Sequence, residues 1–329
     1  MCALRLRILI ISPDSGGIQR GNAVTSTRWA GILRRLGHEV ALSSDYKDEA
    51  IDLMLALHAR HSAGAARRFR QARPQGRLIV ALTGTDLYGH GTLFDDEGSQ
   101  LAHSTMDLAD ALVVLQPAAL DEIPSSLRPR AQVIYQSLDF EGPTIDPDPR
   151  EFRVFVLATL RELKDPLAAA RAAARLPSSS RISVLHVGGV IDTELESEVR
   201  AAESRNPRYR WLGEQPRERA LGLLAGSRAL VHTSRFEGGA NAVTEAVALS
   251  IPVLATDIPG NTGLLGNNFP GLVTPGDDLA LTALLHRLEV EPGLHRQLVD
   301  HTELLARNLH PKVELRAWEQ LVNAVFVTP

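Results

Sequence analysis

Two glutamates lie eight positions apart on either side of a pair of glycines in the second half of this 329-residue sequence. Glu237 precedes Gly238 and Gly239, Glu245 follows them in a segment with helical spacing, and an apolar run at 229–232 comes just before. Exposed amides and the positive end of a helix favour a diphosphate at such a strand-to-helix turn. Glu245, roughly 6 Å further along the helix at 1.5 Å per residue, is placed to reach a pair of ribose hydroxyls, and Glu237 to face a sugar. The segment predicts a sugar-nucleotide site; the alternative is an ordinary turn with a surface glutamate.

Two cations follow another apolar run of the same half. Arg161 and Lys164 come just after residues 154–158, which have the composition of a buried strand. Cations at the carboxyl end of a strand can neutralise the charge on a leaving diphosphate. We therefore expect both to flank a diphosphate held at the Gly238 turn. The alternative is a surface pair beside the neighbouring acidic residues.

The first half contains a basic stretch. Residues 53–85 include no Asp or Glu, although the whole chain has a net charge of −4. His58, Arg60 and His61 come just after the apolar run 53–57, at the edge where sites of parallel sheets form, and their charges suit an anionic second substrate. Most of the other arginines are interpreted instead as the solvated face of a helix; they are Arg67, Arg68, Arg70 and Arg73.

Other polar groups follow predicted strands at the same edge. Gly16 and Gly17 lie in a loop after the first strand, where a backbone can approach a phosphate or a sugar. This loop does not match Gly-x-Gly-x-x-Gly, so a nicotinamide or flavin enzyme is disfavoured. Thr83, Thr85 and the carboxylate of Asp86 follow the apolar run 78–82, and this segment either lines the site or does not.

Composition narrows the class of partner. The small net charge and the mixture of acidic and basic residues disfavour nucleic acid or a membrane surface and favour a small molecule. The single cysteine, Cys2, excludes an internal disulfide and a cysteine-based metal cluster. No run approaches the roughly 20 apolar residues of a transmembrane helix, so we expect a soluble cytoplasmic protein. We predict no metal site, because Asp-Pro-Asp at 146–148 lies in a proline-rich segment and His186 and His232 lie in apolar runs typical of a core.

The elements that must position these residues alternate between strand and helix, which is typical of parallel sheets with crossover helices. In the first half a helix is predicted over 25–36, and strands are predicted at 6–12, 38–43, 53–57, 78–82, 111–115 and 132–135. In the second half a last helix is predicted over 312–326, and strands are predicted at 152–158, 182–187, 209–212, 229–232, 252–255 and 271–273. Residues 260–263 form a second glycine loop or, equally, an ordinary turn.

The predicted fold class is α/β, with two doubly wound Rossmann-like domains facing a cleft. Residues 1–141 form the first domain, which is expected to bind the acceptor. Residues 142–150 form a proline-rich linker, and residues 151–311 form the domain that binds the nucleotide-sugar donor. Residues 312–329 form a C-terminal helix that is expected to pack on the first domain. The oligomeric state is left open.

The Glu-x7-Glu element within this pattern resembles the retaining GT-B glycosyltransferases of the large family that contains sucrose and glycogen synthases. The resemblance implies that Glu237 binds the donor sugar, Glu245 the ribose, and Arg161 and Lys164 the diphosphate. It also implies that four backbone amides bind the β-phosphate; they belong to Gly238, Gly239, Ala240 and Asn241. It implies a UDP-sugar as substrate, with no cofactor and no metal. This sequence departs from the family in having Glu-Gly-Gly-Ala-Asn in place of Glu-Gly-Phe-Gly and a shorter spacing from Arg161 to Lys164.

A narrower resemblance covers nearly the whole chain. Six segments are similar to the selenosugar synthases of selenoneine biosynthesis; they are residues 20–30, 56–63, 82–88, 114–117, 160–166 and 257–261. The resemblance implies transfer of a sugar from UDP-N-acetylglucosamine or UDP-glucose to selenophosphate, which gives a 1-selenosugar and releases UDP and phosphate. Selenophosphate is anionic and already nucleophilic, so it needs cationic positioning rather than a base. His58, Arg60 and His61 suit that role, with help from Arg20, Asn22, Arg28, Thr83 and Thr85.

Two alternatives stay open. One is a GT-B glycosyltransferase that uses a UDP-sugar and a conventional hydroxyl acceptor. The other is a nucleotide-sugar-binding protein without catalysis, which is suggested by the altered Glu-Gly-Gly-Ala segment. Which UDP-sugar is used, the anomeric outcome and the residue that assists loss of phosphate are not specified by the sequence.

Overall fold

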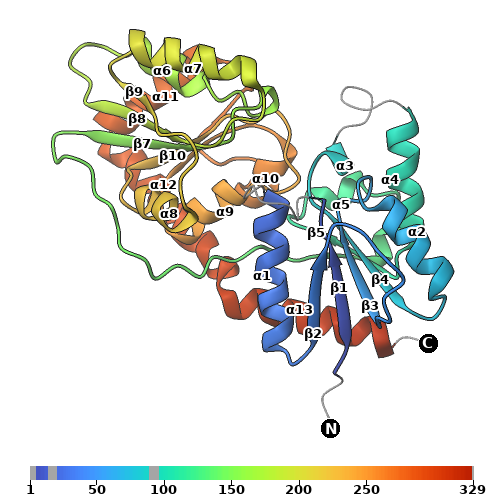
Figure 1. Cartoon of the computed structure of the whole chain (residues 1–329). Helices are drawn as coiled ribbons and strands as arrows, with labels where there is room; N and C mark the ends of the chain where they lie inside the picture. Colours follow the sequence, from blue (N-terminus) through green and yellow to red (C-terminus); the bar gives the residue numbers. More distant parts are fainter. Residues whose placement is uncertain (1–4, 14–20, 89–95, 328–329) are drawn as a thin grey trace. The chain divides into compact units, whose positions relative to one another are not determined.

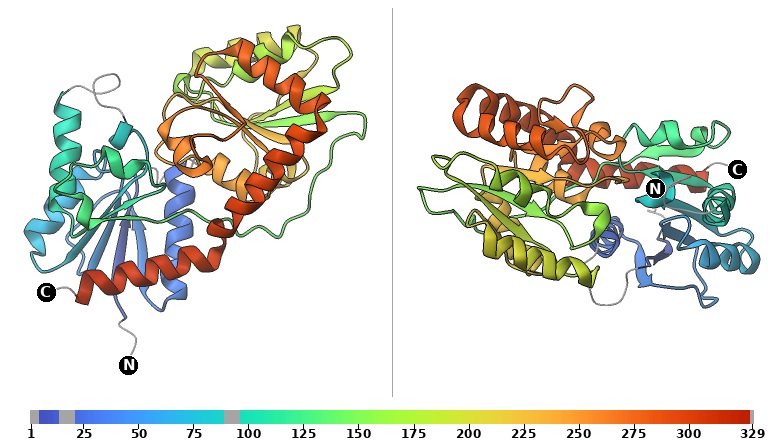
Figure 2. Two further views of the ribbon diagram at one scale, coloured as in Figure 1. Left: turned by 180° about the vertical axis from the view of Figure 1, so that it is seen from behind. Right: turned by 90° about the horizontal axis from the view of Figure 1, so that it is seen from above.

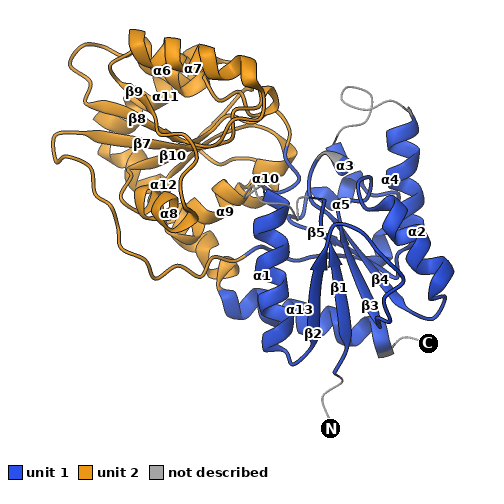
Figure 3. Ribbon diagram, in the orientation of Figure 1, with its two compact units in different colours: residues 1–136, 237–239, 311–329 blue, residues 137–236, 240–310 orange. Residues whose placement is uncertain are grey.

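The computed structural model describes residues 5–13, 21–88 and 96–327 of the chain. The chain forms two compact units, which have different colours in Figure 3. Unit 1 contains residues 1–136, 237–239 and 311–329, and unit 2 contains residues 137–236 and 240–310. The division falls after residue 136 rather than after residue 141, and the predicted linker at 142–150 is counted with unit 2.

Unit 1 is built on a parallel sheet of six strands in the order β2-β1-β3-β4-β5-β6. The strands are β1 (Arg7–Ile11), β2 (Glu39–Ser43), β3 (Leu53–Leu57), β4 (Arg77–Leu82), β5 (Ala111–Val114) and β6 (Ala131–Val133). In β1, Ile8 pairs with Val40 of β2 on one side and with Leu53 of β3 on the other. Because all pairings are parallel, the six carboxyl ends lie at one edge of the sheet.

Helices cover both faces of this sheet and explain its continuous apolar strands. They are α1 (Gly21–Arg35), α2 (Ala63–Ala72), α3 (Thr85–Tyr88), α4 (Asp96–Leu108), α5 (Ala119–Glu122), η1 (Arg128–Arg130) and α13 (Pro311–Val327). Alternate residues of β1 point to opposite faces, so Ile8 and Ile10 join a different core cluster from Leu9 and Ile11. The first cluster includes side chains of α1 and α13, and the second includes side chains of α2 and α4.

The C-terminal helix α13 is an integral part of unit 1. Trp318 of α13 packs edge to face on Trp29 of α1, with ring centroids 4.7 Å apart, and both rings are fully buried. Figure 2 shows α13, in red, running along the sheet that β1 and its neighbours form. Aromatic pairs of this kind stabilise a core beyond the area that they bury. Residues 311–327 therefore pack on the fold of the first half of the chain.

Unit 2 repeats the same architecture with a different strand order, β12-β11-β10-β7-β8-β9. Its strands are β7 (Phe152–Leu157), β8 (Ile182–Val187), β9 (Tyr209–Trp211), β10 (Ala229–His232), β11 (Val253–Thr256) and β12 (Leu272–Val273). Figure 1 shows α6 and α7 on one side of this sheet and α8 and α9 on the other. The helices are η2 (Glu162–Lys164), α6 (Ala168–Ala174), α7 (Thr193–Arg205), α8 (Arg217–Ala225), α9 (Asn241–Ala248), α10 (Pro259–Leu265), α11 (Asp278–Val290), α12 (Pro292–Ala306) and η3 (Arg307–Leu309).

The predicted α/β class with two Rossmann-like sheets is confirmed, and the strands at 53–57, 182–187 and 229–232 begin and end where the sequence predicts. The loop predicted at 260–263 was wrong, because these residues lie inside α10. Ile258 caps this helix with extended backbone and Pro259 opens it, so the helix starts almost directly after β11. Within the described ranges, none of the helices is long and apolar enough to cross a bilayer.

Candidate active site

The strand order of unit 2 changes direction between β7 and β10. From β7 the sheet continues through β8 and β9 on one side and through β10, β11 and β12 on the other. Loops that leave two such strands diverge, and ligands of open α/β sheets bind in the space beyond their carboxyl ends. The loop after β7 holds Arg161 and Lys164, and the loop after β10 holds Glu237, Gly238 and Gly239. Both groups predicted from the sequence therefore follow the strands that flank the switch point.

Hydrogen bonds join the start of the loop after β10 to residues 163–165 of the loop after β7. The buried Thr233 donates its hydroxyl to the carbonyl oxygens of Asp165, at 2.9 Å, and Lys164, at 3.2 Å. The amide of Arg235 donates to the carbonyl oxygen of Leu163, also at 2.9 Å. The segment that holds the two predicted cations is thus fixed against the start of the loop after β10.

Asp165 shapes the same segment. Its backbone φ is 41°, in the left-handed region, at the end of η2. Its carboxylate is buried and pairs with Arg171, at 2.9 Å, and with Arg235, at 3.7 Å. A buried carboxylate needs such compensation, because an unpaired charge away from water is costly. Arg161 differs from these arginines: it is exposed, and no ion pair engages it among the residues that the structure describes.

Helix α9 starts where the glycines end. Ala240 is its N-cap and has extended backbone, and Asn241 is its first helical residue. The first amides of a helix have no partner within the helix and form its positive end. The predicted anion-binding segment 238–241 therefore leads into a helix of the expected polarity, and Ala240 and Asn241 lie at its start.

Glu245 is buried one turn into α9 and is paired with an arginine of another helix. Its carboxylate Oε1 lies 2.6 Å from a guanidinium nitrogen of Arg217, the first residue of α8. The side chain of Glu245 is only 5% exposed, whereas that of Arg217 is 32% exposed. This pairing was not predicted from the sequence, because the two residues are 28 positions apart and no short motif contains both.

The backbone after β8 packs closely against the first residue of the loop after β7. A Cβ on Gly188, which follows β8, would lie 1.7 Å from the carbonyl oxygen of Ala158, so only glycine fits. The same oxygen accepts a hydrogen bond from Nε2 of His186, and Nδ1 of this ring lies 2.7 Å from the Tyr209 hydroxyl. Burial lowers the pKa of His186 to about 4, so the ring is neutral near neutral pH. The expectation that His186 is a core residue is met by this geometry.

Unit 1 has its own change of direction, between β1 and β3. His58 follows β3 directly, is 4% exposed and has a φ of 67°, which is uncommon for a residue other than glycine. Its amide donates to the Ala81 carbonyl oxygen, and its carbonyl oxygen accepts from the Ser62 amide. Its ring stacks on that of His61, with centroids 4.0 Å apart. The structure therefore brings His58 and His61 together at this edge, and Arg60 lies between them in sequence and is half-buried.

Asp86 of α3 joins the loops that follow β3 and β4. Its two carboxylate oxygens accept hydrogen bonds from the amides of Ala59 and Gly84, both at 2.8 Å. One of these oxygens lies 3.9 Å from Nδ1 of His58. Asp86 is 1% exposed, so a buried carboxylate lies beside the histidines that were predicted to bind an anion. Thr83 is half-buried at the same edge, and its hydroxyl has no partner among the described residues.

Two other residues predicted to bind the acceptor, Arg28 and Asn22, lie in α1. The guanidinium of Arg28 contacts Gln136 and the carboxylate of Glu314, which also accepts a 2.7 Å hydrogen bond from the indole of Trp29. Glu314 is 1% exposed, so Arg28 neutralises a buried charge of α13. Asn22 lies in the first turn of α1 and is half-buried.

Four predicted residues have no described side chain. Gly16, Gly17 and Arg20 lie outside the described residues, as does the side chain of Thr85, although the backbone of Thr85 begins α3. Their roles stay predictions. The interpretation of the arginines of α2 as a solvated face is consistent with exposed Arg67 and Arg68, whereas Arg70 pairs with Asp110 at 2.5 Å.

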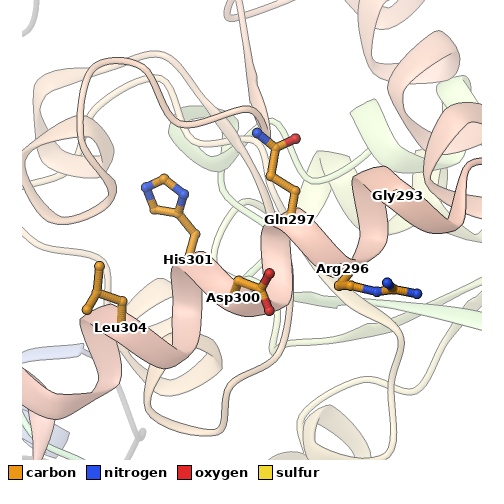
Figure 4. Close-up of a pocket in the computed structure, with 6 residues that line it drawn as sticks. All are labelled: Gly293, Arg296, Gln297, Asp300, His301 and Leu304. Atoms are coloured by element: carbon orange, nitrogen blue, oxygen red, sulfur yellow. The ribbon is translucent and has the colours of Figure 1, made fainter.

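A surface hollow of unit 2 does not identify a different site. Among the described residues, no group of three or more His, Cys, Asp or Glu side chains is arranged to hold a metal ion. Figure 4 shows a surface hollow whose lining side chains all come from the single helix α12. They are Gly293, Arg296, Gln297, Asp300, His301 and Leu304. This hollow includes no residue from the carboxyl edge of either sheet, so it is not the candidate site.

The second half of the chain is similar to known proteins. Residues 143–304 match the family of glycosyl transferases group 1. Glycosyltransferase 1 domain-containing protein 1 of Xenopus tropicalis is 30% identical over 158 residues, which are 47% of this chain and 45% of that protein. The chain thus aligns with about half the length of this curated relative.

Solved structures resemble almost the whole chain. HepE of Anabaena in complex with UDP-glucose has a TM-score of 0.78 and 16% identity, over 97% of this chain and 100% of that chain. Sucrose-phosphate synthase of Thermosynechococcus elongatus has a TM-score of 0.75 and 18% identity, over 98% and 99% of the two chains. At such identities the likeness establishes the fold, and the narrower resemblance to selenosugar synthases stays a prediction. Residues 143–304 therefore resemble the glycosyl transferases group 1 family, within a chain that has the GT-B fold.

Proposed function

We propose that this protein is a glycosyltransferase that transfers a sugar from a UDP-sugar. The observation that carries the proposal is the switch point of unit 2, where two hydrogen-bonded loops hold the residues predicted to bind a diphosphate. The match of residues 143–304 to the family of glycosyl transferases group 1 supports the reaction class. The UDP-glucose complex of the structurally similar HepE supports the choice of donor.

Each donor group has a role that its environment suits. The buried carboxylate of Glu245 accepts hydrogen bonds from the ribose hydroxyls, and the amides at the start of α9 bind the β-phosphate. Arg161 and Lys164 neutralise the charge that develops as the bond between the sugar C1 and the diphosphate oxygen breaks. Glu237 binds the sugar. These interactions stabilise UDP as a leaving group through the protein's own groups.

A hydroxyl acceptor is the leading proposal for the second substrate. The comparisons support a glycosyltransferase and no particular acceptor. In addition, the buried carboxylate of Asp86 lies 3.9 Å from His58, which offsets part of the positive charge predicted at this edge.

Selenophosphate is the second candidate, favoured by the grouping of His58, Arg60 and His61 after β3. In that reaction selenium attacks C1 of the sugar and UDP leaves. Water then cleaves the bond between phosphorus and selenium, which releases phosphate and the 1-selenosugar. The histidines and Arg60 would neutralise the charge of selenophosphate during the attack.

UDP release from UDP-glucose and UDP-N-acetylglucosamine tests these proposals. The purified protein is incubated with each donor alone, with selenophosphate, or with a panel of sugar and lipid alcohols. Release that depends on an alcohol supports the leading proposal, and release that depends on selenophosphate supports the second. Saturable UDP binding without turnover under any condition would instead identify a nucleotide-sugar-binding protein.

The ribose role of Glu245 has its own test. Glu245→Ala should weaken UDP binding by about 1–3 kcal/mol, because a buried hydrogen-bonded contact to the ribose is lost. Calorimetric titration with UDP measures the change. An unchanged affinity would refute the role of Glu245 in the proposed donor site.

A further inference from the structure

The ion pair between α8 and α9 connects the predicted ribose-binding carboxylate to a residue outside the predicted site. Arg217 lies 2.6 Å from Oε1 of Glu245, and the Glu245 side chain is 95% removed from solvent. Transfer of an ionised carboxylate out of water is unfavourable unless a cation or several hydrogen-bond donors compensate it. A guanidinium at this distance supplies both charge and a donor.

We propose that Arg217 is a positioning residue for donor binding, which holds the carboxylate of Glu245 oriented toward the ribose hydroxyls of the nucleotide. This inference rests on the proposed function, because it takes Glu245 as the ribose ligand. Arg217 acts through Glu245 and is not assigned a contact with the reacting atoms.

The position of Arg217 in the fold suits this task. As the first residue of α8, it lies just after the loop that follows β9, on the carboxyl side of the sheet. Its side chain is about one-third exposed, so the guanidinium retains part of its hydration while it contacts a carboxylate that has lost nearly all of its own. The pair therefore costs less desolvation than one in which both groups are buried.

Arginine also has a geometric advantage over lysine at this position. Its planar guanidinium holds a carboxylate in a fixed orientation, whereas an ammonium provides a point charge on a flexible chain. A ribose diol needs acceptor oxygens with a defined direction, because hydrogen bonds weaken steeply as their angle falls. Position and orientation of the Glu245 oxygens are thus the properties that Arg217 should control.

The preference for UDP over an analogue without the ribose hydroxyls shows whether Arg217 positions Glu245 or only stabilises the fold. Binding of UDP and of 2′,3′-dideoxy-UDP is measured by calorimetry for the wild-type protein, Arg217→Met, Arg217→Lys and Glu245→Gln. The wild-type protein should prefer UDP by roughly 10- to 100-fold, the range for hydrogen bonds to a charged group. Arg217→Met should reduce this preference to within about threefold and leave affinity for the dideoxy analogue nearly unchanged. Arg217→Lys should retain part of the preference, because it keeps the charge without the planar geometry.

A double-mutant cycle and a matched control complete the experiment. If Arg217 acts through Glu245, adding Arg217→Met to Glu245→Gln should change the UDP affinity by less than about threefold, although each single change has a large effect. The control is Arg181→Met, which removes an arginine 3.7 Å from Glu289, another glutamate with a side chain only 6% exposed. Arg181 precedes β8 at the opposite edge of the sheet, so its loss should not alter the preference for the diol.

The outcomes distinguish this inference from the proposed function. A wild-type protein that binds no UDP would overturn both. UDP binding without preference over the dideoxy analogue would remove Glu245 as the ribose ligand and the role of Arg217 with it. A full preference in Arg217→Met, or additive effects in the cycle, would overturn the role of Arg217 alone and leave the donor site in place.

Discussion

Acidification should destabilise unit 2 through one buried histidine. Nε2 of His186 lies 2.8 Å from the carbonyl oxygen of Ala158, and Nδ1 lies 2.7 Å from the hydroxyl of Tyr209. A carbonyl oxygen only accepts, so Nε2 bears the proton and the tyrosine donates to Nδ1. The network is complete for a neutral ring. A second proton on Nδ1 would take the place of the one that the tyrosine donates.

The size of the effect follows from the pKa of His186, which burial lowers from 6.5 to about 4. Between these values the unfolded chain binds a proton that the folded protein does not bind. The free energy of unfolding therefore has its full value above pH 6.5 and decreases as the pH falls toward 4. At pH 5 a shift of this size removes about 2 kcal/mol.

Urea titrations at pH 7.5 and pH 5.0 measure this contribution. Hydrogen exchange read by mass spectrometry follows peptides of β8 in unit 2, while peptides of β3 in unit 1 serve as the internal reference. His186→Gln is the control, because its amide does not titrate. The wild-type protein should lose about 2 kcal/mol more than His186→Gln between the two pH values.

Two results would refute the reasoning. One is an equal loss of unfolding free energy in the wild-type protein and His186→Gln. The other, which does not depend on how well the variant folds, comes from the nitrogen resonances of the wild-type imidazole. A ring that gains its second proton near pH 6.5 in the folded protein would contradict the hydrogen-bonded neutral form.

Two further substitutions test the packing around the sites. Glu314→Ala should lower the free energy of unfolding of unit 1, measured in urea, by about 3 kcal/mol, because it leaves the largely buried guanidinium of Arg28 without its carboxylate. A change below about 0.5 kcal/mol would contradict this anchoring of α13. Gly188→Ala should prevent unit 2 from folding, since its Cβ would lie 1.7 Å from the carbonyl oxygen of Ala158, and hydrogen exchange of β7 peptides would detect the loss. Gly64→Ala is the matched control, because its Cβ would meet only the far end of a side chain at 3.5 Å, and it should stabilise α2 by about 0.5–1 kcal/mol.

The strands were predictable because burial on both faces leaves continuous apolar runs. Residues 53–57 and 182–187 are examples, and their predicted limits are those observed. Helix starts were less accurate: α1 begins at Gly21, not at residue 25, because Gly21 and Asn22 have low helix propensity and do not suggest a helix. The same cause hid α10, whose glycines at 260 and 263 suggest a turn although Pro259 provides a favourable helix start.

The sequence predicts which residues of the candidate site follow the ends of strands. It does not predict which of their side chains form pairs. Residues that follow parallel strands lie at one edge whatever the strand order, so Arg161 and His58 were assigned to edges without knowledge of the topology. The partners of buried charges depend on packing between elements far apart in sequence. The pairings of Asp86 with His58 and of Arg217 with Glu245 were not predicted for this reason, because no short motif contains both members of either pair.

These pairs change how the charges around the loops after β7 and β10 should be counted. The net charge of a segment suggests how many cations are available to a diphosphate, but Arg235 and Arg171 pair with the buried carboxylate of Asp165, and Arg217 pairs with Glu245. Arginines that compensate a buried carboxylate contribute little field to an anion in solution. Arg161 has no such carboxylate among the described residues and is exposed after β7. A phosphate at this edge would therefore gain more from Arg161 than from the arginines that the fold already uses to neutralise its own buried acids.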